Sequence, residues 1–181
     1  SGQLARSLRL TAAQVRKDLA WFGPLGRPGV GYEVGPVLRH LRQALGTDRP
    51  WRVALVGAGN LGRALLRYKG FREKGFEIVA AFDIAAAKIG RRIGGVPVLP
   101  IARLAQTVRE QEIRLAILTV PTDAAQDTAE QLRNAGIVGV LNFTPTLLNT
   151  GPDVACYPVD LAASLEQLAF QVTARNRRSG D

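Results

Sequence analysis

Residues 57–62 read Gly-Ala-Gly-Asn-Leu-Gly and stand between an apolar run and a helical pattern. Residues 51–56, before the glycines, are apolar enough for a buried strand, and the residues from Asn60 to about Tyr68 have the pattern of a helix. A strand, a tight glycine turn and a helix N-terminus form an anion site, because backbone N–H groups and the positive helix end point to one place. This unit is typical of parallel α/β sheets, and it restricts the fold more than any other feature of the chain.

Each glycine of the turn has its own steric reason. Gly57 permits the tight turn, Gly59 lets a pyrophosphate approach the backbone, and Gly62 lets the helix lie close to the sheet. Asp83 follows about twenty residues later, at the end of the apolar run 76–82. A carboxylate there accepts hydrogen bonds from a ribose 2′-hydroxyl and repels a 2′-phosphate, which favours NAD(H) over NADP(H). The alternative is a glycine turn between packed elements, with Asp83 as a strand-end cap.

The composition is that of a globular protein with a basic surface. Of the 181 residues 46% are hydrophobic, but no apolar run is long enough to span a bilayer and no signal-peptide pattern opens the chain. The single cysteine, Cys156, excludes an intrachain disulfide framework and favours a cytoplasmic protein. The formal net charge is +9, and residues 1–50 hold eight basic side chains against three acidic ones. A basic end favours a polyanionic partner, most often nucleic acid.

Residues 1–22 have the pattern of two short helices joined by a tight turn, which is the helix-turn-helix motif. Thr11 and Gln14 form a capping box that opens the second helix, and Gly23 ends it. The apolar face of this helix carries Ala12, Val15, Leu19 and Phe22.

Residues 24–32 are too rich in glycine and proline for a helix and suit a tight hairpin, or wing, with Arg27 near its tip. Pro36 starts a third helix that Gly46 ends. Residues 47–50 read as a linker, so a domain boundary is expected there.

From residue 51 onward, short apolar runs alternate with helical patterns, which predicts a doubly wound parallel sheet of the Rossmann type. The further strands are expected at 113–120, 137–143 and 154–159, and the further helices at 101–111, at 122–135 before Gly136, and from about Asp160 to Arg175. The last helix has a broad apolar stripe, which packs either on its own domain or against a second subunit. The stripe consists of Leu161, Leu165, Leu168, Ala169 and Val172.

The sequence offers poor candidates for catalysis. Hydride transfer commonly uses a proton donor beside the substrate carbonyl, but the single histidine, His40, falls on the predicted third helix and suits a surface or helix-packing role. No Tyr-x-x-x-Lys pair occurs, and no histidine or cysteine cluster suggests a metal. These features favour a protein that binds a cofactor and DNA over an enzyme.

Several motifs in order then resemble the Rex family of redox-sensing transcriptional repressors, over essentially the whole chain. They are Gln14-Val15-Arg16-Lys17-Asp18-Leu19, Phe22-Gly23, Gly29-Val30-Gly31-Tyr32, 56–62, Tyr68-x-Gly70-Phe71, Phe82-Asp83, Leu118-Thr119-Val120-Pro121, 139–145 and Val159-Asp160-Leu161.

The resemblance implies a homodimer that binds operator DNA when NADH is low and is released when NADH binds, with NAD⁺ as a weaker competitor. It implies a winged helix domain at residues 1–47, a Rossmann NAD(H)-binding domain at 50–160, and a C-terminal helix and tail at 161–181 exchanged across the dimer.

The resemblance also implies the cofactor contacts. The expected residues are Gly57, Ala58, Gly59, Asn60, Leu61, Gly62, Tyr68, Asp83, Lys88, Thr119, Val120, Pro121, Asn142, Phe143 and Asp160. Lys88 matches a family lysine near the adenine end, with a solvated helix lysine as the alternative. Tyr68 and Asp160 match residues near the nicotinamide, and Asp160 also suits the N-cap of the last helix.

The implied DNA contacts lie on the second helix and in the wing. Arg16 and Lys17 meet phosphates or bases in the major groove, and Arg27 reaches from the wing. The expected DNA-binding residues are Gln14, Arg16, Lys17, Arg27 and Gly29. Trp21, by contrast, is expected to pack and not to read DNA.

The chain departs from the family in three places. The family's first helix, upstream of the helix-turn-helix, is absent from this sequence: either the fragment binds DNA weakly, or the helix exists in the protein and is missing from this sequence. Arg27-Pro28 stands where many members have Thr-Arg, and Leu161 stands where many have Phe. The change at Arg27-Pro28 affects the wing, and the change at Leu161 removes an aromatic contact near the nicotinamide.

Two other functions remain open at this point: a small NAD-dependent oxidoreductase, and a CoA- or nucleotide-binding module.

Overall fold

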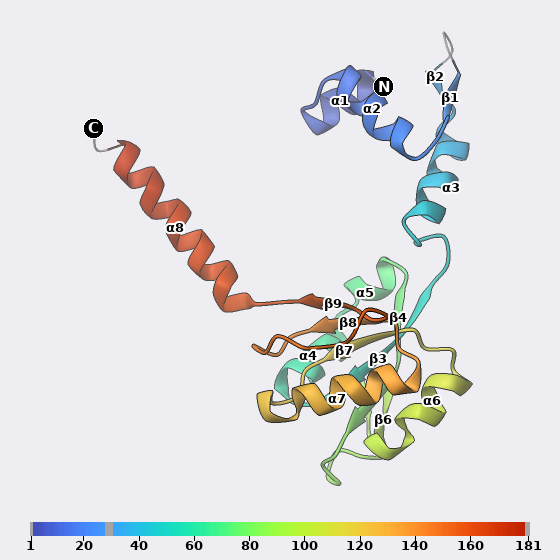
Figure 1. Cartoon of the computed structure of the whole chain (residues 1–181), viewed down its shortest axis with the longest axis vertical. Coiled ribbons are helices and arrows are strands. Elements are labelled where there is room, and N and C mark those ends of the chain that lie inside the picture. The colour runs from blue at the N-terminus through green and yellow to red at the C-terminus, as the bar shows by residue number, and fades with distance from the viewer. Residues whose placement is uncertain (1, 28–30, 180–181) are drawn as a thin grey trace. The chain divides into compact units, whose positions relative to one another are not determined.

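The computed structural model describes residues 2–27 and 31–179, which fall into two compact units, Ser1–Pro50 and Trp51–Asp181 (Figure 1). The division follows the residues predicted as a linker, where Pro50 precedes the first strand of the second unit.

The first unit begins with two short helices, α1 (Gly2–Leu8) and α2 (Ala12–Trp21). The predicted cap of α2 is confirmed, because the Thr11 hydroxyl oxygen accepts from the backbone N–H of Gln14 at 3.2 Å. The predicted end is confirmed as well, since Phe22 is the C-cap and Gly23 follows with φ +114°. Val15 is buried, as the apolar pattern of α2 requires.

A small antiparallel hairpin follows, formed by β1 (Gly26–Arg27) and β2 (Gly31–Tyr32). The third helix, α3 (Val34–Ala44), begins two residues before the predicted start at Pro36. A proline is tolerated in this first turn because its missing N–H has no intrahelical acceptor there. His40 has a helix-packing role, because its Nε2–H donates to the carbonyl oxygen of Phe22 at 2.6 Å and ties α3 to the end of α2.

The second unit is built on a seven-stranded sheet with the order β5-β6-β4-β3-β7-β8-β9. The strands are β3 (Trp51–Val56), β4 (Phe76–Asp83), β5 (Arg92–Ile93), β6 (Val96–Pro100), β7 (Leu115–Leu118), β8 (Gly139–Asn142) and β9 (Ala155–Pro158). All pair in parallel except the edge strand β5. The predicted doubly wound sheet is therefore confirmed, although the strands near 113–120 and 137–143 are shorter than predicted.

Helices cover both faces of this sheet (Figure 1). These helices are α4 (Asn60–Arg67), α5 (Gly70–Glu73), α6 (Leu104–Glu110), preceded by the 3-10 turn η1 (Ile101–Arg103), and α7 (Thr122–Ala135). The last helix, α8 (Leu161–Ser179), follows β9 and contributes no described side chain to the apolar clusters of the sheet. Leu104 of α6 and Leu132 of α7 pack into one apolar cluster, and Leu66 of α4 packs into the other. The last helix continues four residues beyond the predicted end.

One part of the sheet has less cover. The connection from β8 to β9 contains no helix in the residues described, and an apolar groove of about 460 Å³ lies over β7, β8 and β9. We call it the sheet groove, and its lining includes Phe71, Phe76, Leu115, Leu141 and Tyr157. The side chains of α8 that are described are also largely exposed, including Leu165, Leu168 and Phe170.

Candidate functional site

The glycine turn lies where the sheet reverses its direction of growth. From β3 the chain passes to β4 and β6 on one side and later to β7, β8 and β9 on the other. The crevice at the carboxyl ends of β3 and β7 is therefore the switch point of the sheet, where open α/β sheets bind ligands. Both α4 and α7 begin at this edge, directly after Gly59 and Pro121.

The three glycines of the turn differ in their surroundings. Gly57 has φ +100°, and a Cβ on it would lie 2.6 Å from the backbone oxygen of Thr119. A Cβ on Gly62 would overlap the carbonyl oxygen of Gly57. Gly59 is the exception, because a Cβ there would meet no atom of the chain within 4 Å. Packing requires the first and third glycines, whereas the open space at Gly59 suits a group that approaches from outside.

Thr119 supports the turn from the neighbouring strand. Its backbone N–H donates to the carbonyl oxygen of Val56 at 2.9 Å, and its hydroxyl oxygen lies 2.7 Å from the carbonyl oxygen of Gly57. The hydroxyl is therefore occupied in shaping the turn, and Val120 and Pro121 continue past it to the start of α7.

The first turn of α4 faces the open space with free donors. Gly59 is the N-cap, and no side chain in the described part of the protein caps the helix. The backbone N–H groups of Asn60 and Leu61 are the first of α4 and have no intrahelical acceptor, so together with the positive helix end they suit an anion.

Asp83 connects the glycine turn to the end of β4. Its side chain is only 7% exposed, and Oδ2 accepts from the backbone N–H of Ala58 and from Lys88 Nζ, both at 2.8 Å. Oδ1 accepts from the backbone N–H of Ala85 at 2.8 Å. A carboxylate has about four acceptor positions, so one remains for a further donor such as a ribose hydroxyl.

The protonation state of Asp83 follows from these partners. Burial raises the pKa of this carboxyl, but the hydrogen bonds from Lys88, Ala85 and Ala58 and the charge of Lys88 together outweigh burial and lower the pKa below its ordinary value. Asp83 is therefore ionised at neutral pH. Lys88 lies in a turn after β4, so the alternative of a solvated helix lysine is wrong.

Asn142, at the carboxyl end of β8, uses its side chain to shape its own loop. It is buried, its Oδ1 accepts from both the N–H and the hydroxyl of Thr144, and its Nδ2 donates to the carbonyl oxygen of Thr146. Phe143 follows and packs against the apolar cluster beneath α4. Sequence reasoning missed Thr144 and Ala85. The signal for the former was an asparagine two residues before a threonine, which is typical of an Asx-turn.

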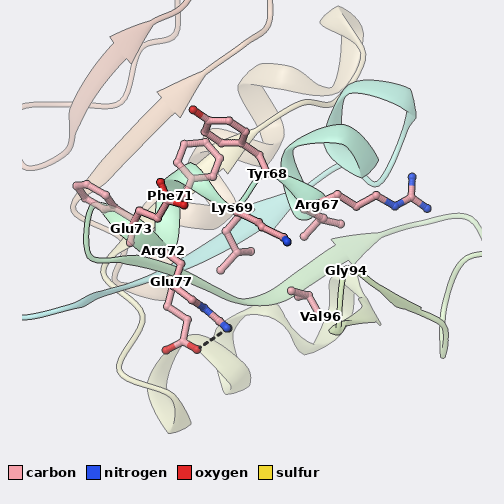
Figure 2. Close-up of a pocket in the computed structure, with 12 residues that line it drawn as sticks. Arg67, Tyr68, Lys69, Phe71, Arg72, Glu73, Glu77, Gly94 and Val96 are labelled. Atoms are coloured by element: carbon pink, nitrogen blue, oxygen red, sulfur yellow. Dashed lines mark hydrogen bonds and ion pairs between the residues drawn. The ribbon is translucent and has the colours of Figure 1, made fainter.

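Tyr68 lies at the far end of α4 from the glycine turn. It is the C-cap of this helix, is 61% exposed and meets Phe71 edge to face, with 5.1 Å between the ring centroids. Figure 2 shows the two rings at a groove of about 540 Å³ beside Lys69, where Arg72 pairs with Glu77 at 3.3 Å. Within one chain, Tyr68 is therefore not brought to the open space at Gly59.

Asp160 precedes α8. Its Oδ1 accepts from the backbone N–H of Ala163 at 2.9 Å, which confirms the predicted capping role. The preceding Val159 N–H donates to the carbonyl oxygen of Asn142, so the chain enters α8 beside the end of β8.

In the first unit, α2 presents a polar face on the side away from Val15. Gln14, Arg16 and Lys17 are all exposed there. Arg27 ends β1, and Gly29 lies outside the described residues. The expectation that Trp21 packs is wrong, because its side chain is 86% exposed. The apolar stripe of α2 lies on the opposite side, so the last residue of the helix falls on the polar face.

Residues 48–146 match the protein family described as a CoA binding domain. A redox-sensing transcriptional repressor Rex from Carboxydothermus hydrogenoformans is 48% identical over 172 residues, which are 95% of this chain and 83% of that protein. The Rex repressor of Chloroflexus aurantiacus is 42% identical over 170 residues, 94% of this chain and 80% of that protein.

Solved structures agree with these relatives. RSP in complex with β-NAD⁺ and operator DNA has a TM-score of 0.87 at 33% identity, covering 98% of this chain and 82% of that one. RSP in complex with β-NADH has a TM-score of 0.81 at 32% identity, covering 98% and 83% of the two chains. RSP is described as a Rex-family repressor.

Proposed function

The chain belongs to the Rex family of redox-sensing transcriptional repressors, and we propose that it occupies operator DNA until NADH binds at its glycine turn. The proposal rests on one combination within a single chain. The turn leaves open space at Gly59 for a pyrophosphate, and the ionised Asp83 lies beside it. The same chain carries a basic helix-turn-helix.

The residues at the turn fit a dinucleotide. The N–H groups of Asn60 and Leu61 donate to the pyrophosphate in the space that Gly59 leaves open, and the remaining acceptor position of Asp83 receives a hydroxyl of the adenosine ribose. A 2′-phosphate would place negative charge against an ionised carboxylate, so NADPH binds worst. Lys88 pairs with Asp83, and this pairing supports its assignment to the adenine end of the dinucleotide.

Redox discrimination acts through charge at the nicotinamide. The nicotinamide supplies a ring that is neutral when reduced and positive when oxidised. Asp160, at the start of α8, is the carboxylate that registers the difference. Leu161 beside it offers an aliphatic contact where many relatives have an aromatic one, which blunts the preference for NADH.

The first unit binds the operator. Lys17 and Arg16 of α2 contact phosphates or base edges in the major groove, with Gln14 beside them, and we assign Arg27 and Gly29 to the DNA contact as well. The excess of basic over acidic residues in 1–50 supplies the attraction that does not depend on sequence.

The protein acts as a homodimer. The sheet groove and the apolar stripe of α8 are both exposed in a single chain, and patches of this kind mark interfaces. We assign 161–181 to the dimer contact, with α8 exchanged between subunits.

In the described residues no helix has the length and apolarity to cross a membrane, and no cluster of three or more histidine, cysteine or acidic side chains could hold a metal. We place the protein in the cytoplasm, where operator DNA and the NADH pool are found.

CoA is the second candidate ligand, because the family matched by residues 48–146 is described as a CoA binding domain. CoA also carries a pyrophosphate, to which the same N–H groups could donate. A competition experiment shows whether the two ligands share the turn. NADH displaces a fluorescent CoA analogue if both bind there. Binding of CoA that NADH leaves unchanged would contradict the assignment of NADH to the turn.

The function is tested with a labelled duplex that the chain itself selects from a random-sequence pool. The proposal predicts tight binding of the selected duplex, with an affinity that falls steeply as salt is raised and falls further when NADH is added. NAD⁺ has a smaller effect. Failure to enrich any duplex, or equal effects of the two nucleotides, would contradict the proposal.

A further inference from the structure

Trp21 is the last residue of α2, and its indole is almost fully exposed. Large aromatic side chains are usually well buried, and an indole at this exposure is available to a partner outside the unit. The ring has a defined neighbour: it meets Phe22 edge to face, with ring centroids 5.4 Å apart and an interplanar angle of 83°. Phe22 is itself half-buried, so this contact orients the indole.

The position of Trp21 on α2 places it among polar side chains. At about 100° per residue, Gln14, Lys17 and Trp21 fall within an arc of about 60°. We call these three residues the recognition face. The buried Val15 lies on the other side of the helix, so the face is free of the unit's own core.

The charge of the unit favours DNA as the occupant of this face. Residues 1–50 hold eight basic side chains against three acidic ones, and Lys17 stands on the recognition face itself. Asp18 flanks the face, and an aspartate can accept from the amino group of cytosine. A face with one cation, one amide and one exposed indole matches what the major groove displays, namely phosphates, polar base edges and the methyl groups of thymines.

We propose that Trp21 reads thymine: its indole packs against the C5-methyl group of a thymine in the operator half-site. The inference rests on the proposed function, because it requires that α2 enters the major groove. It assigns sequence specificity to a side chain for which packing had been expected. The contact is apolar, so it contributes to operator affinity without adding to the salt dependence.

The test is a double-mutant cycle between protein and DNA. Trp21→Ala is compared with the unmodified protein on the selected duplex and on duplexes in which deoxyuridine replaces single thymidines, a change that removes only the methyl group. Covering about 50 Å² of apolar surface corresponds to about a tenfold change in Kd. We expect Trp21→Ala to weaken binding about tenfold, one deoxyuridine position to weaken binding of the unmodified protein several-fold, and the same position to leave Trp21→Ala unchanged.

Two controls keep the outcomes separate. Leu45→Ala removes another exposed apolar side chain, 64% exposed next to the linker, and leaves operator affinity unchanged. Lys17→Ala lowers the slope of log K against log salt by about 0.9, whereas Trp21→Ala leaves that slope unchanged. Circular dichroism verifies that each variant is folded.

Fluorescence gives an independent readout. The chain has two tryptophans, so Trp51→Phe leaves Trp21 as the only indole. The selected duplex should shift and quench its emission. Wild-type affinity of Trp21→Ala, or equal deoxyuridine effects in both proteins, would overturn the inference while the proposed function stands. If the unmodified protein binds no selected duplex, the proposed function itself fails.

Discussion

Replacing Gly59 with alanine separates folding from cofactor binding at the turn. Gly59 has φ −73° and ψ −164°, a conformation that any residue adopts, and a Cβ there meets nothing within 4 Å. Alanine is a poorer N-cap than glycine but loses less entropy on folding, and the two effects are each below about 1 kcal/mol and opposite in sign. We therefore expect the melting temperature of Gly59→Ala to stay within about 3 °C of the unmodified chain.

Binding of NADH responds differently. The added methyl occupies the space through which a pyrophosphate reaches the N–H groups of α4. Losing two hydrogen bonds to a charged group costs about 3 kcal/mol, which corresponds to about a hundredfold weaker binding. Isothermal titration calorimetry with NADH measures the loss, and thermal melts of the ligand-free protein measure stability.

Gly62→Ala is the matched control. The same methyl here meets the carbonyl oxygen of Gly57 and lies 3.0 Å from the Thr119 hydroxyl oxygen, so backbone must move. Overpacking of this kind costs about 1–3 kcal/mol, and we expect the melting temperature to fall by several degrees. The reasoning is refuted if Gly59→Ala binds NADH with unchanged affinity, or if it loses as much stability as Gly62→Ala.

Three further predictions address Asp83 and the dimer. Asp83→Asn weakens NADH binding about tenfold, because an amide attracts ribose hydroxyls less strongly than a carboxylate does. It also narrows the preference for NADH over NADPH, because an amide does not repel a 2′-phosphate. Calorimetry with both nucleotides checks this, and an unchanged preference contradicts it. The lowered pKa of Asp83 means that its contribution to stability is present above its ordinary pKa and is lost as pH falls through the lowered value, so unfolding free energies measured toward acid pH should decline less for Asp83→Asn than for the unmodified chain. Leu168→Glu places a charge on the apolar stripe of α8 and should shift the monomer–dimer equilibrium, measured by sedimentation, toward the monomer. Gln167→Glu, on the polar side of the same helix, should leave this equilibrium unchanged. Equal behaviour of the two variants would contradict the assignment of α8 to the interface.

The sequence predicted the elements whose local chemistry is complete within a few residues. The cap at Thr11, the end of α7 at Gly136 and the strand–turn–helix around 57–62 need only neighbours in the chain, and all are confirmed. The pair β5 and β6 was missed because two-residue strands have no periodicity and because Pro97 and Pro100 argue against a strand.

The site could be predicted in outline only. The spacing from the glycines to Asp83 indicates the ribose carboxylate, but its bonds to Ala58 and Lys88 depend on how β4 and the turn meet in space. The helical period of α2 predicts its buried stripe correctly, whereas the prediction that Trp21 packs is wrong. The same period places Trp21 on the polar side of the helix, where its indole is exposed, although a tryptophan is more often buried.

The most direct measurement of the central claim follows operator occupancy while the ratio of NADH to NAD⁺ is varied at constant total nucleotide. Fluorescence anisotropy of the selected duplex reports the bound fraction at each ratio. A sensor that reads the reduced ring releases the duplex progressively as the NADH fraction rises. Occupancy that stays constant across the whole range, or that falls as the NAD⁺ fraction rises, would contradict an NADH-responsive repressor.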